Sequence, residues 1–314
     1  MITRLIQLLL AVTLLFSQSA EARDWPDIQK SGTLRVGIRD SSEMLYTSNS
    51  LQYPGLLYEM IYDFATSHQL TIEIVIIPSF ADYWKKDDII LLKTDLIATP
   101  DIYNKIDIAA DIFTVTPERQ KLIHMTPFID NTELIFGRKN DRIDNYQNLI
   151  GKILLTYEAM SFSNIVQNSM DAHSIPYVIS YVDVVDDHIV MPSSKKLAAD
   201  AVNLYLIPQN SSLKGNGNYF EIAQNQADAS ISDALNMIFR LYENTFFKEN
   251  LKPLFRARAE LSQLAWGSRL NDMALHKQLA EFLIKDKASG NFSKRLLKYT
   301  GFTLEEYQEI LQLQ

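Results

Sequence analysis

The chain has 314 residues, of which 47% are hydrophobic and 22% are charged. This composition indicates about two globular domains and excludes a disordered chain, a collagen and a polytopic membrane protein. The formal net charge is -8, which argues against a surface that holds nucleic-acid phosphates. The sequence has no Cys, and no two of its five His are spaced four residues apart, so neither thiolate chemistry nor a helical His pair for a metal is expected.

Residues 1–22 have the pattern of an export signal. Arg4 precedes an apolar stretch, Leu5 to Phe16, which is too short for the roughly 20 residues of a membrane-spanning helix. The sequence Ala20-Glu-Ala22 has the small-x-small form that signal peptidase recognises. We predict cleavage after Ala22 and export of the mature chain, with an uncleaved membrane anchor as the alternative.

The first part of the mature chain predicts a β-α-β unit. Gly32 to Ile38 alternates apolar and polar side chains, as a strand does. Apolar residues then recur at helical spacing from Leu56 to Ala65. Thr71 to Ile77 is a nearly continuous run of Ile and Val, which predicts a strand buried on both faces of a parallel sheet.

The next segments predict a short strand followed by a well-formed helix start. Asp107 to Ala110 reads as the strand. In Thr116-Pro-Glu-Arg119, Thr116 is suited to the N-cap, Pro to the first helical position and Glu to the first turn. Glu133 to Arg138 predicts another strand.

A second set of α/β signals follows, and the chain then returns to the first. Strands are expected at 151–156, 176–185 and 264–267, helices at 161–170, 233–246 and from 273 to a stop at Gly290, and a polar loop at 210–218. Thr303-Leu-Glu-Glu306 is a capping box that opens a last helix. Two α/β modules are therefore predicted, with late elements coming back to the first.

Several of these segments resemble, in order and spacing, bacterial periplasmic solute-binding proteins of the polar amino acid type (extracellular solute-binding protein family 3). The most specific is Asp107 to Arg119 followed by His124-Met-Thr-Pro-Phe128; the others are Ser31–Gly37, Gly55–Glu59, Gln226–Asp233 and Ser289–Tyr299. The substrate-binding module of membrane-bound lytic transglycosylases is similar as well. The chain departs from the family at Ala159-Met160-Ser161, where Gly-Ser/Thr is usual, and in two longer stretches, 81–106 and 183–218.

The resemblance implies an α/β fold of the two-lobed periplasmic binding type (type II), with a helix-flanked sheet in each lobe. One lobe is expected to comprise 23–131 and 258–314, and the other 132–257. Two crossing segments, near 129–138 and 256–267, would form the hinge. The implied protein is a periplasmic monomer without a cofactor. It captures a small polar solute bearing a carboxylate and presents it to an ABC-type transporter permease, or alternatively to a membrane sensor.

The same resemblance assigns candidate ligand contacts. Arg119, at the third position of its helix, can hold a carboxylate with its planar fork. Asp233 matches the family residue that receives the ligand ammonium, although as the residue before a helix it can equally be a plain N-cap. Thr114 and Asp111 are expected on the turn that enters the Arg119 helix, with Asp111 either accepting a cation or solvated.

Three further candidates follow from position. Ser161 is either an N-cap or a hydroxyl facing the ligand. Phe80 and Tyr46 fall near strand ends, where aromatic walls line such clefts, although aromatic residues at these places are as often core. Tyr157 and Glu158 could line the second lobe.

Enzyme functions have weaker signals. Ser193-Ser-Lys-Lys196 satisfies Ser-x-x-Lys, but its companion motifs are missing. The residues after Tyr299 are too few for a transglycosylase domain, so we expect a stand-alone binding protein. One enzyme remains as an alternative, a cyclohexadienyl dehydratase on the same fold, with Glu158 or Asp111 as its general acid.

Overall fold

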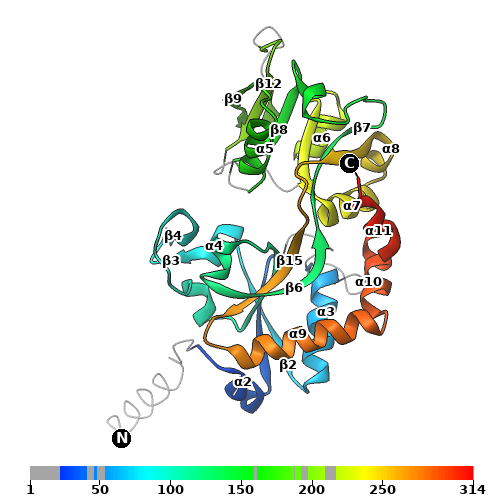
Figure 1. Ribbon diagram of the computed structural model, residues 1–314. Helices are drawn as coiled ribbons and strands as arrows, with labels where there is room; N and C mark the ends of the chain where they lie inside the picture. The colour runs from blue at the N-terminus through cyan, green and yellow to red at the C-terminus, as the bar shows by residue number, and fades with distance from the viewer. Residues whose placement is uncertain are drawn as a thin grey trace, which may run out of the picture.

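The computed structural model describes residues 22–40, 46–47, 54–158, 161–186, 188–191, 197–208 and 217–313. These residues form two sheets, each with its own helices, which lie one above the other in Figure 1. We call the five-stranded sheet and its helices the first lobe, and the six-stranded sheet and its helices the second lobe. Residues 1–21 of the predicted signal segment and the Ser193–Lys196 motif lie outside the described residues.

The first lobe is built on a mixed sheet. Its order is β2 (Thr71–Ile76), β1 (Thr33–Ile38), β5 (Ile108–Thr114), β15 (Ser262–Arg269), β6 (Ile123–Asn131). β1 pairs in parallel with β2 and β5, whereas β15 returns from the second lobe and runs antiparallel to β5 and β6.

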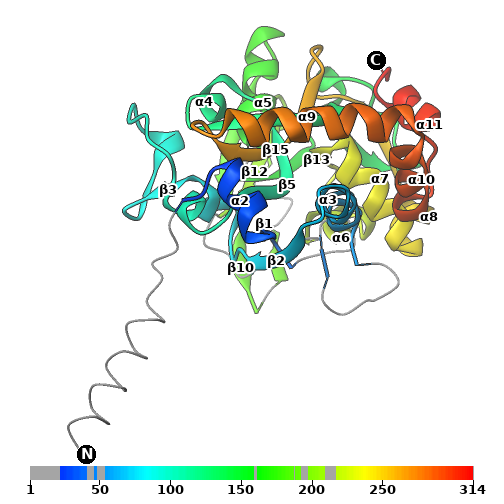
Figure 2. The same ribbon diagram turned by 90° about the horizontal axis from the view of Figure 1, so that it is seen from below.

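Helices cover this first sheet. α2 (Trp25–Ser31) contacts β1, α3 (Leu56–Ser67) contacts β2 and β5, and α9 (Met273–Ala288) lies along β6 (Figure 2). All six apolar positions that predicted α3 are buried. The stretch 81–106 forms a compact group of short elements, namely η1 (Phe80–Trp84), β3 (Lys85–Lys86), β4 (Ile89–Ile90), η2 (Leu91–Lys93) and η3 (Asp101–Asn104).

The second lobe has a six-stranded sheet. Its order is β14 (Leu251–Arg256), β7 (Glu133–Arg138), β13 (Ala229–Asp233), β8 (Ile153–Tyr157), β12 (Val202–Ile207), β9 (Tyr177–Tyr181). The flanking elements are η4 (Tyr146–Leu149), α5 (Ser161–Ala172), α6 (Gly217–Ala223), α7 (Ala234–Glu243), α8 (Thr245–Asn250) and the hairpin β10 (Asp183–Val185) with β11 (His188–Val190). β12 is buried at every position, as expected of a central parallel strand covered on both faces.

Two segments join the lobes. One runs from β6 to β7 through Thr132, and the other runs from β14 to β15 through residues 257–261 (Figure 1). The proposed lobe boundaries, 131/132 and 257/258, fall in these two segments. The last helices, α10 (Asn291–Thr300) and α11 (Leu304–Ile310), lie beside the junction, where α10 contacts both α3 and α7.

Three expectations about elements were wrong. β2 is an edge strand, and none of its positions is buried. The expected strand 176–185 is split into β9 and β10, and the expected helix 233–246 is split into α7 and α8. The second split occurs at Asn244, whose side chain accepts hydrogen bonds from Phe246 N and Phe247 N and so caps α8.

Candidate functional site

Arg119 lies in the four-residue helix α4 (Pro117–Gln120), directly after β5. The Thr116 side chain accepts a hydrogen bond from Arg119 N at 3.3 Å, so the helix start predicted from the sequence is present. The Arg119 side chain turns back toward the strand end, and its Nη1 donates to the Thr114 carbonyl oxygen at 2.8 Å. The residue is only 8% exposed.

Aromatic rings surround this guanidinium. Its carbon lies 5.0 Å from the Trp84 ring centroid and 5.4 Å from that of Phe80. A second guanidinium, that of Arg39, lies 5.4 Å from the same Phe80 ring. Cations within about 6 Å of an aromatic centroid are attracted to the ring face. We call Arg39, Phe80, Trp84, Asp111 and Arg119 the arginine cluster.

The two arginines of the cluster differ in charge balance. Arg39 makes a bidentate ion pair with Asp111, at 2.6 Å from Nε to Oδ2 and 2.9 Å from Nη2 to Oδ1. Burial lowers the pKa of Arg39, but Asp111 outweighs burial and raises it. Among the described residues, no carboxylate lies within ion-pair distance of Arg119, and burial lowers its pKa to about 10. In the part of the chain that the structure describes, Arg119 is therefore a buried cation with no contacting counter-ion.

Asp111 corrects one expectation. It lies inside β5 rather than on a turn, and it is completely buried. Its carboxylate is not solvated, because Arg39 donates to both oxygens and Ile112 N donates to Oδ1 at 2.7 Å. Thr114 is likewise the last residue of β5, and it contributes its backbone carbonyl to Arg119.

Asp233 ends β13 and precedes α7, but its side chain does not cap that helix. Instead Asp233 Oδ1 accepts a hydrogen bond from Asn131 Nδ2 at 2.9 Å. Burial and, to a smaller extent, the charge of Glu133 raise the pKa of Asp233 to about 7, although the Asn131 hydrogen bond and the charges of Arg119 and Arg258 act in the opposite direction. The plain N-cap interpretation was therefore wrong, and the carboxylate lies within electrostatic range of Arg119.

The surroundings of Asp233 belong to the junction between the lobes. Asn131 Nδ2 also donates to Ser262 Oγ at 3.2 Å. The buried Glu133 carboxylate accepts from Arg258 Nε at 2.7 Å and from Ser262 Oγ at 3.2 Å. Tyr307 of α11 donates to the Asp130 carbonyl oxygen at 2.9 Å. Asp233 is thus held where both crossing segments and the last helix meet.

The other candidates are not brought into the arginine cluster. Ser161 is the first residue of α5 and is half-buried. The Tyr46 ring lies 5.3 Å from that of Tyr58 on α3. Among the described residues, no hydrogen bond or ring contact joins Ser161 or Tyr46 to Arg119 or Phe80. Tyr157 is largely buried in β8, and Glu158 accepts a hydrogen bond from Tyr181 at 3.3 Å.

Sequence reasoning missed Arg39, Trp84, Asn131 and Glu133. Arg39 directly follows β1, and Asp111 lies on the neighbouring strand β5. The parallel pairing of these two strands was therefore the signal from which the Arg39–Asp111 contact could have been predicted. The other three lie in the 80–106 stretch or at the junction. Their roles depend on contacts between distant segments, which no local pattern reveals.

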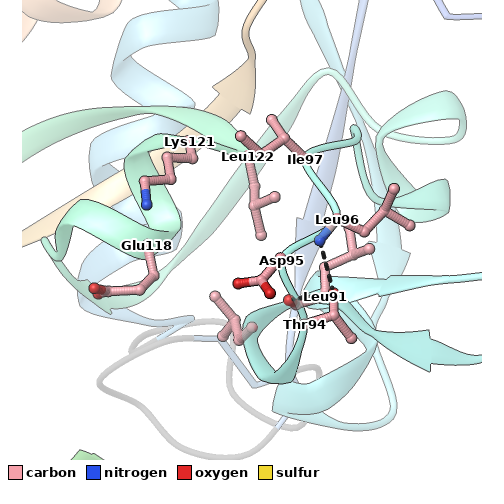
Figure 3. A pocket seen from close by; sticks show the side chains of 9 residues that line it. Leu91, Thr94, Asp95, Leu96, Ile97, Glu118, Lys121 and Leu122 are labelled. Atoms are coloured by element: carbon pink, nitrogen blue, oxygen red, sulfur yellow. Dashed lines mark hydrogen bonds between the residues drawn. The ribbon is translucent and has the colours of Figure 1, made fainter.

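A cavity of about 530 Å³ adjoins α4 but is separate from the arginine cluster. Glu118, Lys121 and Leu122 line it on one side, and residues 91–92 and 94–97 line it on the other (Figure 3). No residue of the cluster contributes to it. In the described part of the chain, no group of three or more His, Asp or Glu could hold a metal ion, and none of the helices there has the length and apolar character to cross a membrane.

Comparisons with known proteins define the fold. Neither a protein-family model nor a curated protein matches the sequence. Solved structures do match: a mutant of ArgBP from T. maritima has 17% sequence identity and a TM-score of 0.58, with 88% of this chain and 99% of that chain covered. This chain has a two-lobed solute-binding fold.

Two further solute-binding structures have the same extent of similarity. An ABC uptake transporter substrate-binding protein from Streptococcus pneumoniae with bound histidine is 16% identical, with a TM-score of 0.58 and coverage of 89% of this chain and 97% of that one. An ancestral amino acid-binding protein, a precursor of cyclohexadienyl dehydratase, is 17% identical, with a TM-score of 0.56 and coverage of 88% and 98%. The expected fold class is confirmed.

Proposed function

We propose that the protein is a solute-binding protein that captures a small amino acid-like zwitterion between its two lobes. The observation that carries this proposal is the charge state of Arg119. Burying a cation without a contacting anion is costly, and the desolvation that lowers its pKa expresses this cost. A ligand carboxylate would supply the missing partner through the planar guanidinium fork.

The opposite charge needed for a zwitterion is also present. Asp233 has a buried carboxylate whose one hydrogen-bond donor among the described residues is Asn131. It comes from the second lobe, whereas Arg119 comes from the first. A ligand that placed its carboxylate on Arg119 and its ammonium on Asp233 would contact both lobes. Such a ligand binds the closed form better than the open form and shifts the population toward closure.

The charges near the site favour a ligand without net charge. The Arg39–Asp111 and Arg258–Glu133 pairs each balance internally. Arg119 and Asp233 then remain as one positive and one negative group. Phe80 and Trp84 supply apolar faces beside the cationic end. A neutral amino acid that carries an apolar or aromatic side chain is therefore the class that we infer.

The partner and location follow from the same fold. Structural neighbours include an amino acid-binding component of an ABC uptake transporter, and we infer a transporter partner and a periplasmic location after cleavage following Ala22. A sensor partner is the alternative. Co-purification with a transporter permease, as against a sensor kinase or cyclase, separates the two.

A dehydratase activity has less support, although one neighbour is a precursor of such an enzyme. Of the two carboxyl groups considered as a general acid, Asp111 accepts hydrogen bonds from Arg39 on both of its oxygens. Glu158 accepts a hydrogen bond from Tyr181, and no contact among the described residues joins it to Arg119. Incubation with prephenate tests this alternative, and release of carbon dioxide would contradict a purely binding role.

The experiment that tests the proposal is a thermal-shift screen of amino acids, followed by calorimetry on the best ligand. At about 100 times its dissociation constant, a ligand adds about 2.7 kcal/mol of stability. Arg119→Gln should weaken that ligand by about 30-fold to a few thousand-fold, because truncating one partner of a buried charge pair costs ~2 to 5 kcal/mol. The matched control is Lys121→Gln, a cation two residues further on that is exposed and should leave affinity unchanged.

A further inference from the structure

A second cavity lies on the second lobe, beside the crossing segment 257–261. Its volume is about 480 Å³, within the range of small-molecule sites. It is formed by the end of β14 and the residues after it, by the segment that leads into η4, and by the end of α5. The lining residues are Asp144, Asn145, Tyr146, Gln147, His173, Ile175, Phe255, Arg256, Ala257, Arg258 and Ala259. None of them belongs to the arginine cluster.

Two arginines line this cavity together. Arg256 is the last residue of β14, and Arg258 lies two residues later in the crossing segment; both line the cavity. In the described part of the chain Arg256 makes no ion pair, and its Nε is buried without a hydrogen-bond partner. Arg258 uses Nε for Glu133, which leaves its two terminal nitrogens for another acceptor.

The one carboxylate in the lining does not neutralise these cations. Asp144 is exposed, and its Oδ1 accepts a hydrogen bond from Asn145 Nδ2 at 2.8 Å. No ion pair joins Asp144 to either arginine among the described residues. Because Glu133 balances the charge of Arg258, Arg256 is the cation of this cavity that no carboxylate contacts among the described residues.

The remaining wall is apolar. The Tyr146 and Phe255 rings meet edge to face, with centroids 5.2 Å apart. Tyr146 donates its hydroxyl to the Ala257 carbonyl oxygen at 2.8 Å, so its polar atom is satisfied within the protein. Ile175 and Ala257, both buried, complete this surface.

We propose that this cavity is a second binding site, for a small carboxylate with a flat apolar body such as an aromatic acid. Arg256 and the terminal nitrogens of Arg258 hold the carboxylate, and Tyr146 and Phe255 pack against the ring. Planar guanidinium groups favour carboxylates over single-point acceptors, and aromatic walls select a ring over a methyl group. The site is independent of the amino acid site proposed at Arg119.

The test is a titration of the purified protein with benzoate at pH 7, followed by ligand-observed NMR. We expect saturable binding with a dissociation constant on the order of 1 mM, which corresponds to about -4 kcal/mol. Benzamide, which keeps the ring and loses the charge, and acetate, which keeps the charge and loses the ring, should each bind at least about tenfold more weakly, a difference of about 1.4 kcal/mol.

Variants place the binding in this cavity. Arg256→Gln should weaken benzoate about tenfold or more, because a hydrogen bond to a charged group contributes about 1.5 to 3 kcal/mol. It should leave folding intact, since Arg256 has no ion pair among the described residues. Arg258 is unsuitable for this test, because its loss would leave the buried Glu133 carboxylate without its cation. Arg142→Gln, an exposed arginine outside the cavity lining, is the matched control and should bind benzoate normally.

Arg119→Gln separates this site from the proposed amino acid site. Benzoate affinity that survives Arg119→Gln and falls with Arg256→Gln supports the second site, whether or not an amino acid ligand is found. Affinity that falls with Arg119→Gln and survives Arg256→Gln would place benzoate in the arginine cluster and overturn the proposal. Equal affinity for benzoate and benzamide, or no saturable binding of benzoate, would overturn it as well.

Discussion

Asp233 and Glu133 lie directly opposite each other in the antiparallel pair of β13 and β7, and both side chains are buried. Glu133 has the Arg258 cation and a Ser262 hydroxyl, whereas Asp233 has the Asn131 amide as its hydrogen-bond donor. Like charges that face each other in a sheet are destabilising. A negative charge is therefore better stabilised on Glu133 than on Asp233. Asp233 binds a proton more readily than an ordinary Asp, with a pKa of about 7.

Ligand affinity should depend on pH near neutrality. A ligand ammonium needs the carboxylate form of Asp233, whose pKa is about 7, so affinity should rise about tenfold from pH 6 to pH 8 and then level off. Calorimetric titrations across this range measure the effect. The Asp233→Asn variant should bind more weakly at pH 8 and show a flat profile. A flat profile in the unaltered protein would contradict the role of Asp233.

The same substitution should stabilise the unliganded protein at high pH. Because the pKa of Asp233 is raised on folding, the folded state binds its proton more tightly, and stability is lost as the pH rises from about 4 through 7. Asp233→Asn removes this loss, so its free energy of unfolding at pH 8 should exceed that of the parent by at most about 4 kcal/mol. The difference should shrink toward pH 4. Urea unfolding at pH 4 and pH 8 measures this difference in the free energy of unfolding. An Asp233→Asn variant that is less stable than the parent at pH 8 would contradict the account.

Removing Arg39 should destabilise the first lobe. Its loss leaves the completely buried Asp111 without a cation, a situation that typically costs about 3–5 kcal/mol. Arg39→Gln should therefore lower the free energy of unfolding by about that amount. The double variant Arg39→Gln with Asp111→Asn, which removes both charges, should recover most of it. If the double variant were no more stable than the single one, the ion pair would not be the cause.

Gly301 should tolerate a side chain poorly, in contrast to Gly290. Both glycines have a left-handed backbone, with φ of 68° and 76°, so Ala costs conformational energy at each. A Cβ at Gly290 meets open space, whereas one at Gly301 would overlap the Tyr242 ring of α7. Gly301→Ala should therefore lower the melting temperature more than Gly290→Ala does. The additional loss in the free energy of unfolding should be roughly 1–3 kcal/mol. Equal shifts would show that α10 and α7 do not pack as described.

Strong local signals led to correct predictions. The Thr116 cap with Pro117 placed Arg119 at the third helical position, and the capping box of Thr303 and Glu306 opens α11 as expected. The periodic apolar residues of α3 are all buried. Local chemistry determines these features, because the interacting groups are at most four residues apart in the chain.

The balance of charges in the site could not be predicted in this way. Asp111 and Arg39 are 72 residues apart, and Asp233 and Asn131 are 102 apart. Whether a carboxylate is paired or solvated depends on such distant contacts, so Asp111 was left undecided and Asp233 resembled an ordinary N-cap. The exposed positions of β2 could not be predicted either, because a run of Ile and Val does not reveal which faces of the strand other elements cover.

The central claim, that Arg119 holds the carboxylate of an amino acid ligand, is tested most directly by a double-mutant cycle between protein and ligand. Calorimetry would compare the best amino acid and its carboxamide, each with the unaltered protein and with Arg119→Gln. We predict that either change alone weakens binding by ~2 to 5 kcal/mol and that the second change adds little to the first, because both remove the same interaction. Additive losses, or an Arg119→Gln variant that binds the amino acid as tightly as the parent, would contradict the claim.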